Sequence, residues 1–303
     1  LPAGMDTAET CSIRRLSYRG HLMFTEFSDR TWLWAAAGFY FAGFALGTIA
    51  LLRHGQPSGR ATYGLIAIGY ALQLAGLGVR GRAVGGCPLG NQFEIYQFTA
   101  WSAITLYLLV GVRFRNSLLG YFTALLATAL TTVSLAIPAW DATQRMHIFG
   151  RNPWIELHAA LAVFSYGVFG LLALTSTLFL FRNHSLKSKH LGGWFSFLPS
   201  ILDLDHIGVR LLTAGVTILA VSLGVGSVYW LRDTSSVNLT KLFVTVAVWI
   251  AYAVALGLRL HGVLLAKRFS WACLALFIAA LLSIVPVDQS RHPVSRRAEV
   301  QSR

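Results

Sequence analysis

The class of this protein is decided by one stretch of its sequence, Asn152-Pro153-Trp154-Ile155-Glu156-Leu157-His158, and by the apolar run that follows and ends at Phe181-Arg182. Between Leu157 and Phe181 there is no Asp, Glu, Lys or Arg. A helix needs about 20 consecutive apolar residues to cross the hydrocarbon core of a bilayer. We therefore predict a membrane-spanning helix that carries a histidine near its polar N-terminal end.

The rest of the chain repeats this pattern. It has 303 residues, of which 55% are hydrophobic and 12% charged, whereas soluble domains are about 25% charged. Charged and turn-forming residues separate eight apolar runs, at about 31–53, 61–79, 93–112, 117–139, 156–181, 207–231, 239–260 and 269–287. The sequence therefore predicts an all-α integral membrane protein: a bundle of about eight transmembrane helices over residues 31–287, with polar tails at 1–30 and 288–303.

Basic residues in the loops indicate an orientation. Ten Lys and Arg residues follow the odd-numbered runs and six follow the even-numbered runs. Because cytoplasmic loops carry the excess of Lys and Arg, the odd-numbered loops are predicted to be cytoplasmic and both tails to lie outside. Basic residues in the two tails oppose this assignment. His158 would then face the outer compartment.

The formal net charge of +13 suggests an acidic partner. Nucleic acid is not expected, because the basic residues are scattered from loop to loop without interleaved aromatic residues. Anionic lipid is the simpler partner.

His158 is the first candidate for a binding residue. It follows Trp154 by four residues, so indole and imidazole share one helix face at the depth of the aromatic belt. A flat ligand could stack there, and imidazole is a common metal ligand. The alternative is that His158 is a solvated or capping residue at a helix start. The spacing alone leaves both interpretations open.

The loop before the third run holds a second polar group. Pro88 interrupts the chain, Asn91 stands where a helix would begin, and Glu94 follows three residues later. This spacing is typical of a reciprocal capping pair, which is the interpretation that we favour. The predicted position at the outer face keeps a functional role open.

The three cysteines, at positions 11, 87 and 273, form neither a CxxC motif nor a zinc-binding spacing. Cys273 lies inside an apolar run and is expected to pack inertly. Cys11 and Cys87 would both face the outer compartment, where a disulfide between them is possible.

Several stretches occur in an order that resembles a known family. They are Pro88-Leu89-x-Asn91-x-x-Glu94, Trp154-x-x-Leu157-His158 with Ser165-Tyr166, the segment Leu198-Pro199-Ser200 ahead of Arg210 and Gly215, and Leu260-His261. Over residues 60–292 the chain resembles the cytochrome c assembly family, whose CcsA-, CcmC- and HemX-like members handle heme at the outer face of energy-transducing membranes. The resemblance implies that His158 is an axial ligand of an outer heme.

The resemblance also bears on the other candidates. His292 is the candidate for the second axial ligand, whereas His261 would lie at the inner end of its helix, in an inner site or as a snorkelling residue. Family members carry a tryptophan-rich segment between the two outer ligands, and here residues 226–233 retain Trp230 as their single Trp. Trp154 and Trp230 are the aromatic residues expected beside heme. The HemX-like branch is the nearer match, and an assembly factor is favoured over a complete heme lyase.

Two functions from different classes follow. The first is a heme-handling protein of cytochrome c assembly that holds or passes heme at the outer membrane face, with heme, apocytochrome c or other assembly subunits as partners. The second is a non-catalytic, HemX-like scaffold or regulatory subunit of a larger membrane complex that no longer binds heme. A transporter ranks below both, because no predicted span shows a buried acidic pair or paired broken helices.

Overall fold

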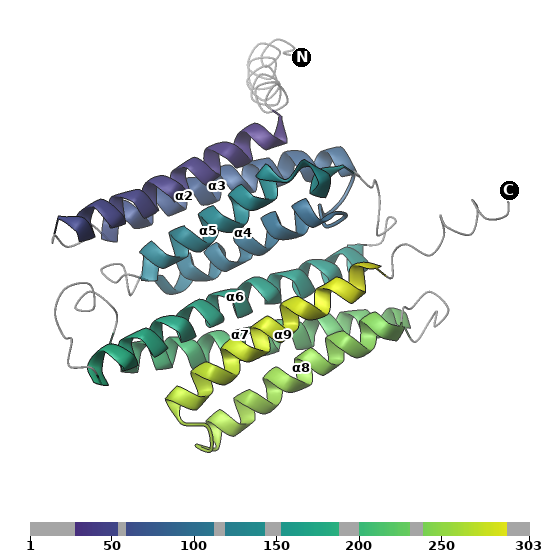
Figure 1. Cartoon of the computed structure of the whole chain (residues 1–303). Coiled ribbons are helices and arrows are strands. Elements are labelled where there is room, and N and C mark those ends of the chain that lie inside the picture. The colour runs from purple at the N-terminus through teal and green to yellow at the C-terminus, as the bar shows by residue number, and fades with distance from the viewer. Residues whose placement is uncertain are drawn as a thin grey trace, which may run out of the picture.

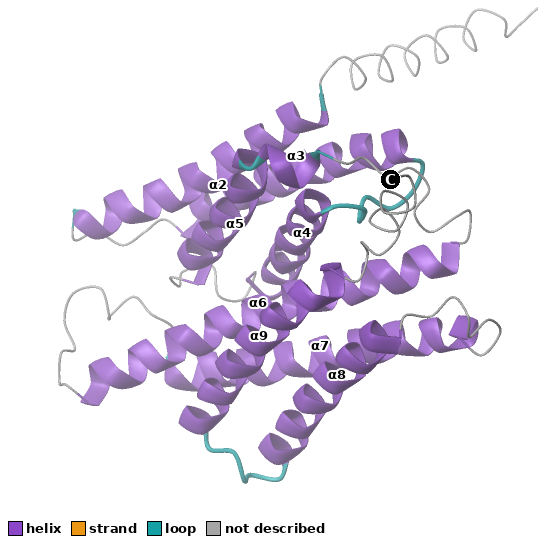
Figure 2. Ribbon diagram, turned by 45° about the vertical axis from the view of Figure 1, so that its right-hand side comes forward, coloured by secondary structure: helices purple, strands orange, loops and turns teal. Residues whose placement is uncertain are grey.

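The computed structural model describes residues 28–53, 59–111, 119–142, 153–187, 200–230 and 239–289. Over these ranges the chain forms eight α-helices and one short 3-10 helix. They are α2 (Asp29–Leu52), α3 (Gly59–Val84), α4 (Gln92–Gly111), α5 (Leu119–Ala136), η1 (Pro138–Asp141), α6 (Pro153–Lys187), α7 (Ile201–Trp230), α8 (Leu239–Leu260) and α9 (Ala266–Gln289). No strand occurs in the described ranges (Figure 2). The predicted all-α helical bundle is confirmed.

The helices form two groups that lie side by side (Figure 1). Helices α2 to α5 make up the first group and α6 to α9 the second, with the closest pairings between α2 and α3 and between α6 and α7. The two groups meet mainly where α4 packs on α6. Consecutive helices run in opposite directions, so the start of α6 and the end of α7 lie at the same end of the bundle.

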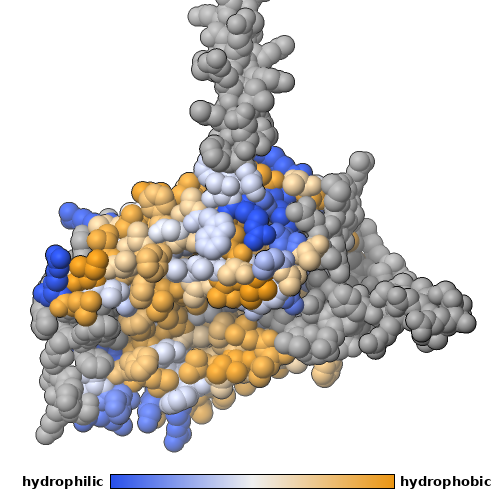
Figure 3. Space-filling view, turned by 45° about the horizontal axis from the view of Figure 1, so that its top comes forward, coloured by the Kyte–Doolittle hydropathy of each residue, from blue (hydrophilic) through white to orange (hydrophobic). Residues whose placement is uncertain are grey.

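The surface of the bundle matches a membrane environment. Six described helices, α2, α3, α5, α6, α7 and α8, are long and apolar enough to cross a bilayer. Large apolar side chains such as Leu109 and Phe243 are exposed on the outside, and hydrophobic surface runs along the helices while hydrophilic surface gathers towards their ends (Figure 3). The chain is therefore a multi-pass membrane protein.

Two helices extend well beyond the apolar runs that predicted them. The run ending at 79 was cut at the first arginine, yet α3 continues to Val84, where Gly85 with φ 70° ends the helix. Similarly, α7 begins at Ile201 and not at 207, because Ser200 caps it: the Ser200 hydroxyl accepts a bond from the Asp203 N–H at 3.1 Å and donates to the Asp203 carboxylate at 2.6 Å. Hydropathy predicts where a helix crosses the membrane, whereas capping residues determine where that helix begins and ends.

A chain of polar side chains ties the first group together in its interior. The Tyr40 hydroxyl donates to Gln73 at 2.9 Å, the Gln73 amide donates to Gln97 at 2.9 Å, and the Gln97 amide donates to Ser134 at 2.8 Å. All four side chains are fully buried. Because hydrocarbon offers no other partner, such bonds between helices favour one arrangement of α2, α3, α4 and α5.

A glycine brings the two groups into contact. A Cβ atom added to Gly167 of α6 would lie 2.7 Å from the Thr99 carbonyl oxygen and 2.9 Å from the Ser102 Cβ of α4. Nearby, the rings of Trp101 and Phe164 meet edge to face with their centroids 6.0 Å apart. The absence of a side chain at residue 167 is what permits this close approach of two helix backbones.

Several sequence predictions fall outside the described residues. These are residues 1–27 and 290–303, with Cys11 and His292, and Leu198 and Pro199 of the segment that resembles the family. The tail boundaries and the roles of Cys11 and His292 remain predictions.

Candidate functional site

His158 lies in the second turn of α6 and faces α7. The helix begins at Pro153, a residue suited to the first helical position. The His158 Nδ1 atom lies 2.7 Å from the backbone carbonyl oxygen of Ser222 on α7. A carbonyl oxygen can only accept a hydrogen bond, so a neutral His158 carries its proton on Nδ1 and its lone pair on Nε2. Nε2 is then the atom that can bind a metal.

Two other predicted site residues, Trp154 and Trp230, belong to the same end of the bundle as His158 by their positions in α6 and α7. Trp154 lies one turn before His158 on α6 and is 56% exposed. Trp230 is the last residue of α7, but its side chain is outside the described part of the structure. The structure thus brings Trp154 and His158 to one helix end.

His261 lies at the other end of the bundle. It follows α8 in an exposed turn that Gly262 closes with φ 74°, through bonds from Gly262 N–H to the Arg259 carbonyl and from Val263 N–H to the Leu258 carbonyl. Arg259 forms an ion pair with Asp205 at the start of α7.

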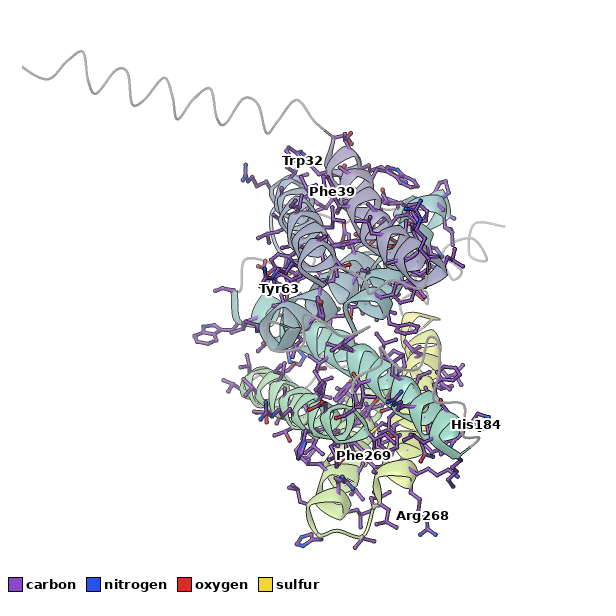
Figure 4. All side chains as sticks on the ribbon, turned by 90° about the vertical axis from the view of Figure 1, so that its left-hand side faces the viewer. Trp32, Phe39, Tyr63, His184, Arg268 and Phe269 are labelled. Carbon is purple, nitrogen blue, oxygen red and sulfur yellow. The ribbon has the colours of Figure 1, made fainter. Side chains whose placement is uncertain are left out.

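The separation of the two histidines follows from positions along α7. Asp205, beside the end of α8, precedes Ser222, beside His158, by 17 residues, or about 25 Å at 1.5 Å per residue. His158 and His261 therefore cannot bind one iron atom. Around Arg259 the packing is closed: its guanidinium lies 5.3 Å above the centre of the Phe269 ring, and Phe269 points into the second group while Arg268 points away from it (Figure 4).

The sequence predictions missed a buried group of charges at the same end as His158. This Arg80 cluster consists of Asp29, Arg30, Arg80, Glu94 and Asp141. The Arg80 guanidinium donates to Glu94 at 2.8 Å and to Asp29 at 2.8 Å, and also bonds to Asp141. The Arg80 side chain is 3% exposed and that of Glu94 1%. One guanidinium thus joins the ends of α2, α3, α4 and η1.

The Arg80 cluster corrects one prediction. The orientation argument places Arg80 in an outer loop after the second apolar run, but Arg80 lies inside α3 and is buried. Two buried carboxylates, Glu94 and Asp141, bond to Arg80, but Asp141 lies in η1, outside the predicted spans, so the expectation that no span carries a buried acidic pair stays a prediction. The signal in the sequence was the stretch from the second apolar run through Arg80 to Gly85, which contains no proline.

The capping prediction for Asn91 and Glu94 is confirmed in one direction. The Asn91 side-chain oxygen accepts a bond from the Glu94 N–H at 2.8 Å. The Glu94 carboxylate, however, accepts a bond from the Gly90 N–H at 2.6 Å and uses its second oxygen for Arg80. Asn91 therefore caps α4, while Glu94 holds the preceding Gly90 and neutralises a buried arginine.

The loop between α3 and α4 joins the Arg80 cluster to the helix that carries His158. A Cβ atom on Gly86 would lie 2.5 Å from the Glu156 Oε1 atom, so the loop packs directly on the first turn of α6. Burial, together with the carboxylates of Glu156 and Glu94, raises the pKa of the Cys87 thiol to about 11. Because the thiolate is the reactive form, this free thiol is a poor nucleophile and metal ligand at neutral pH. The disulfide with Cys11 stays a prediction.

Taken together, the fold and the site define a multi-pass helical membrane protein that holds one histidine against α7 beside a buried charge cluster at one membrane face. The sequence profile of the family described as "Cytochrome C assembly protein" matches residues 89–286, which cover all of α4 to α8 and most of α9. This chain belongs to that family.

Individual relatives are consistent with this membership. The chain is 27% identical over 191 residues to protein HemX of Bacillus subtilis, covering 63% of this chain and 67% of that protein. It is 28% identical over 197 residues to the cytochrome c biogenesis protein CcsA of Chlamydomonas reinhardtii, covering 60% of this chain and 52% of that protein. The inner membrane protein YpjD of Escherichia coli is 22% identical over 143 residues, or 47% of this chain and 54% of that protein.

Proposed function

We propose that this protein handles heme in cytochrome c assembly, holding it or passing it on at the outer membrane face. The observation that carries the proposal is the setting of His158, whose Nδ1 is 2.7 Å from a carbonyl of α7 and whose Nε2 then bears the lone pair. Iron in heme accepts an axial imidazole nitrogen of this kind. Membership of the cytochrome c assembly family supports the same conclusion.

The residues present fit a heme as cargo. His158 would bind the iron, Trp154, exposed one turn away, would offer an aromatic face to the porphyrin, and Trp230 would approach from the end of α7. Among the histidines that the structure describes, His158 alone lies at this end. The second axial ligand would come from the C-terminal tail, where His292 is the candidate.

The test is heme binding by His158→Ala in detergent-purified protein from heme-replete cells. We expect heme affinity to fall at least about tenfold, because loss of a supporting residue alone costs that much and here the ligand itself is lost. The Soret band of any remaining heme should shift. The matched control is His261→Ala, at the far end of the bundle, which should leave both unchanged. A full complement of spectrally unchanged heme in His158→Ala would contradict the proposal.

We further propose a bacterial inner membrane location with both termini and His158 outside, in contact with anionic lipid and with apocytochrome c or other assembly subunits. The excess of Lys and Arg after the odd-numbered runs supports this orientation. Single cysteines placed in the 182–189 and 141–153 segments of an otherwise cysteine-free protein should differ in their labelling from outside in intact spheroplasts. Only the second should react with an impermeant maleimide, and the opposite result would reverse the topology.

The alternative function is a HemX-like scaffold or regulatory subunit that does not bind heme. It is favoured by residues 226–233, which contain a single Trp where the family pattern has several. Wild-type protein that remains free of heme after purification from heme-replete cells would support this alternative over the first proposal.

A further inference from the structure

We infer that Ser222 is the residue that positions His158, through a two-way contact between α6 and α7, so that Nε2 faces the ligand. The inference rests on the proposed function for the identity of that ligand, heme. For the orientation of the imidazole ring it rests only on the geometry of α6 and α7.

Three atom pairs make up the contact. The His158 Nδ1 lies 2.7 Å from the Ser222 carbonyl oxygen and 3.1 Å from the Ser222 hydroxyl oxygen, and the Ser222 hydroxyl donates to the His158 carbonyl oxygen at 2.8 Å. Ser222 uses its own backbone and side chain, and His158 does the same. The two residues, 64 positions apart in the chain, therefore hold each other in both position and rotation.

The hydrogen-bond directions agree with one another only for one tautomer. The hydroxyl hydrogen of Ser222 is used by the His158 carbonyl, so its oxygen can only accept from Nδ1. The Ser222 carbonyl oxygen can likewise only accept. If Nδ1 carried a lone pair, that lone pair would face two oxygen lone pairs. Both oxygens therefore require Nδ1–H, which also raises the basicity of Nε2 towards a metal.

The surroundings make this contact a rigid support. Ser222 is fully buried, and α6 and α7 form the most extensive helix pair in the described structure. Phe169, also on α6, is fully buried and packs closely on Gly215 of α7, where an added Cβ would lie only 2.4 Å from the Phe169 Cε1 atom. This packing fixes the position of α6 relative to α7 beyond the histidine. The bonds of Ser222 then fix the orientation of the imidazole relative to both helices.

The experiment compares Ser222→Ala with Ser165→Ala. Both serines are fully buried, but the Ser165 hydroxyl bonds within its own helix α6, to the Ala162 carbonyl at 2.7 Å, so it is the matched control. Ser222→Ala should weaken heme binding about tenfold, as loss of an outer-shell partner does, and should shift the heme reduction potential to a more positive value. Ser222→Thr, which keeps a hydroxyl, should restore most of both properties.

A second measurement, on heme-free protein, separates the inference from the proposed function. Nitrogen-15 NMR of labelled histidine, with His158→Ala to assign the signal, should show Nδ1-protonated His158 in the wild type and in Ser165→Ala. Ser222→Ala keeps the carbonyl acceptor but loses both hydroxyl contacts, so its Nδ1–H signal should be shifted and broadened. An Nε2-protonated wild type, or a Ser222→Ala signal identical to that of the wild type, would overturn the inference. Protein that shows the expected NMR signals but never binds heme would uphold the positioning role and overturn the heme proposal.

Discussion

Arg80→Ala is expected to lower the free energy of unfolding by about 3–5 kcal/mol, the usual cost of removing one partner from a buried ion pair. The reason is that Glu94 and Asp141 would be left buried at the end of the bundle without the guanidinium that neutralises them. Arg30, which bonds to Asp141 at 3.0 Å and is partly exposed, could compensate for only one of the two. Thermal unfolding in detergent, followed by helical circular dichroism, measures the effect.

Two further variants make the result specific. Arg82→Ala changes an exposed arginine of the same helix and should alter the midpoint of unfolding very little. Arg80→Lys keeps the charge but cannot present three donors in a planar fork to Glu94, Asp29 and Asp141, so it should restore only part of the stability. An Arg80→Ala variant as stable as Arg82→Ala would show that the Arg80 cluster does not hold the helix ends together.

Gly167→Ala is expected to destabilise the protein by about 1–3 kcal/mol through overpacking. The new methyl group would meet the Thr99 carbonyl oxygen at 2.7 Å and the Ser102 side chain. The carbonyl belongs to the α4 backbone and cannot rotate away, so α4 and α6 must move apart. Since this is the main contact between the two helix groups, crosslinking between cysteines placed on α4 and α6 should become slower as the midpoint of unfolding falls.

The control is Gly170→Ala, three residues further along α6. Its Cβ would meet only the Phe277 ring, at an ordinary van der Waals distance of 3.5 Å. This variant should be neutral or slightly stabilising, because alanine is the better helix former. Equal effects of the two substitutions would indicate that helix propensity, and not the approach of α4 to α6, governs position 167.

The Arg80 prediction concerns one continuous structure at the proposed outer end of the bundle. The Arg80 cluster holds the ends of α2, α3 and α4, the loop after α3 packs on Glu156 in the first turn of α6, and His158 follows in the next turn. A disturbance of the charges is therefore expected to reach the histidine through a short path of packed atoms, and heme binding by Arg80→Lys would report it.

The sequence by itself determined the class of the protein and the number and order of its helices. The hydrocarbon core of a bilayer accepts only long apolar segments whose backbone hydrogen bonds are made within the segment. Each transmembrane helix can therefore be recognised from one local run of apolar residues. Local spacing also predicted the cap that Asn91 makes on the Glu94 N–H, and the placement of His158 and His261 at opposite ends followed from the alternating direction of the helices.

Only the tertiary structure decided which polar groups meet. The sequence predicted that Arg80 lies in a loop, because it ends an apolar run. Its burial depends on Asp29 and Asp141, which are 51 and 61 positions away in the chain. Ser222 carried no signal at all, since a serine in a transmembrane run is common and its role depends on a histidine 64 positions away. Hydropathy and caps act within a few residues, whereas the pairing of charges and the orientation of an imidazole depend on how whole helices pack.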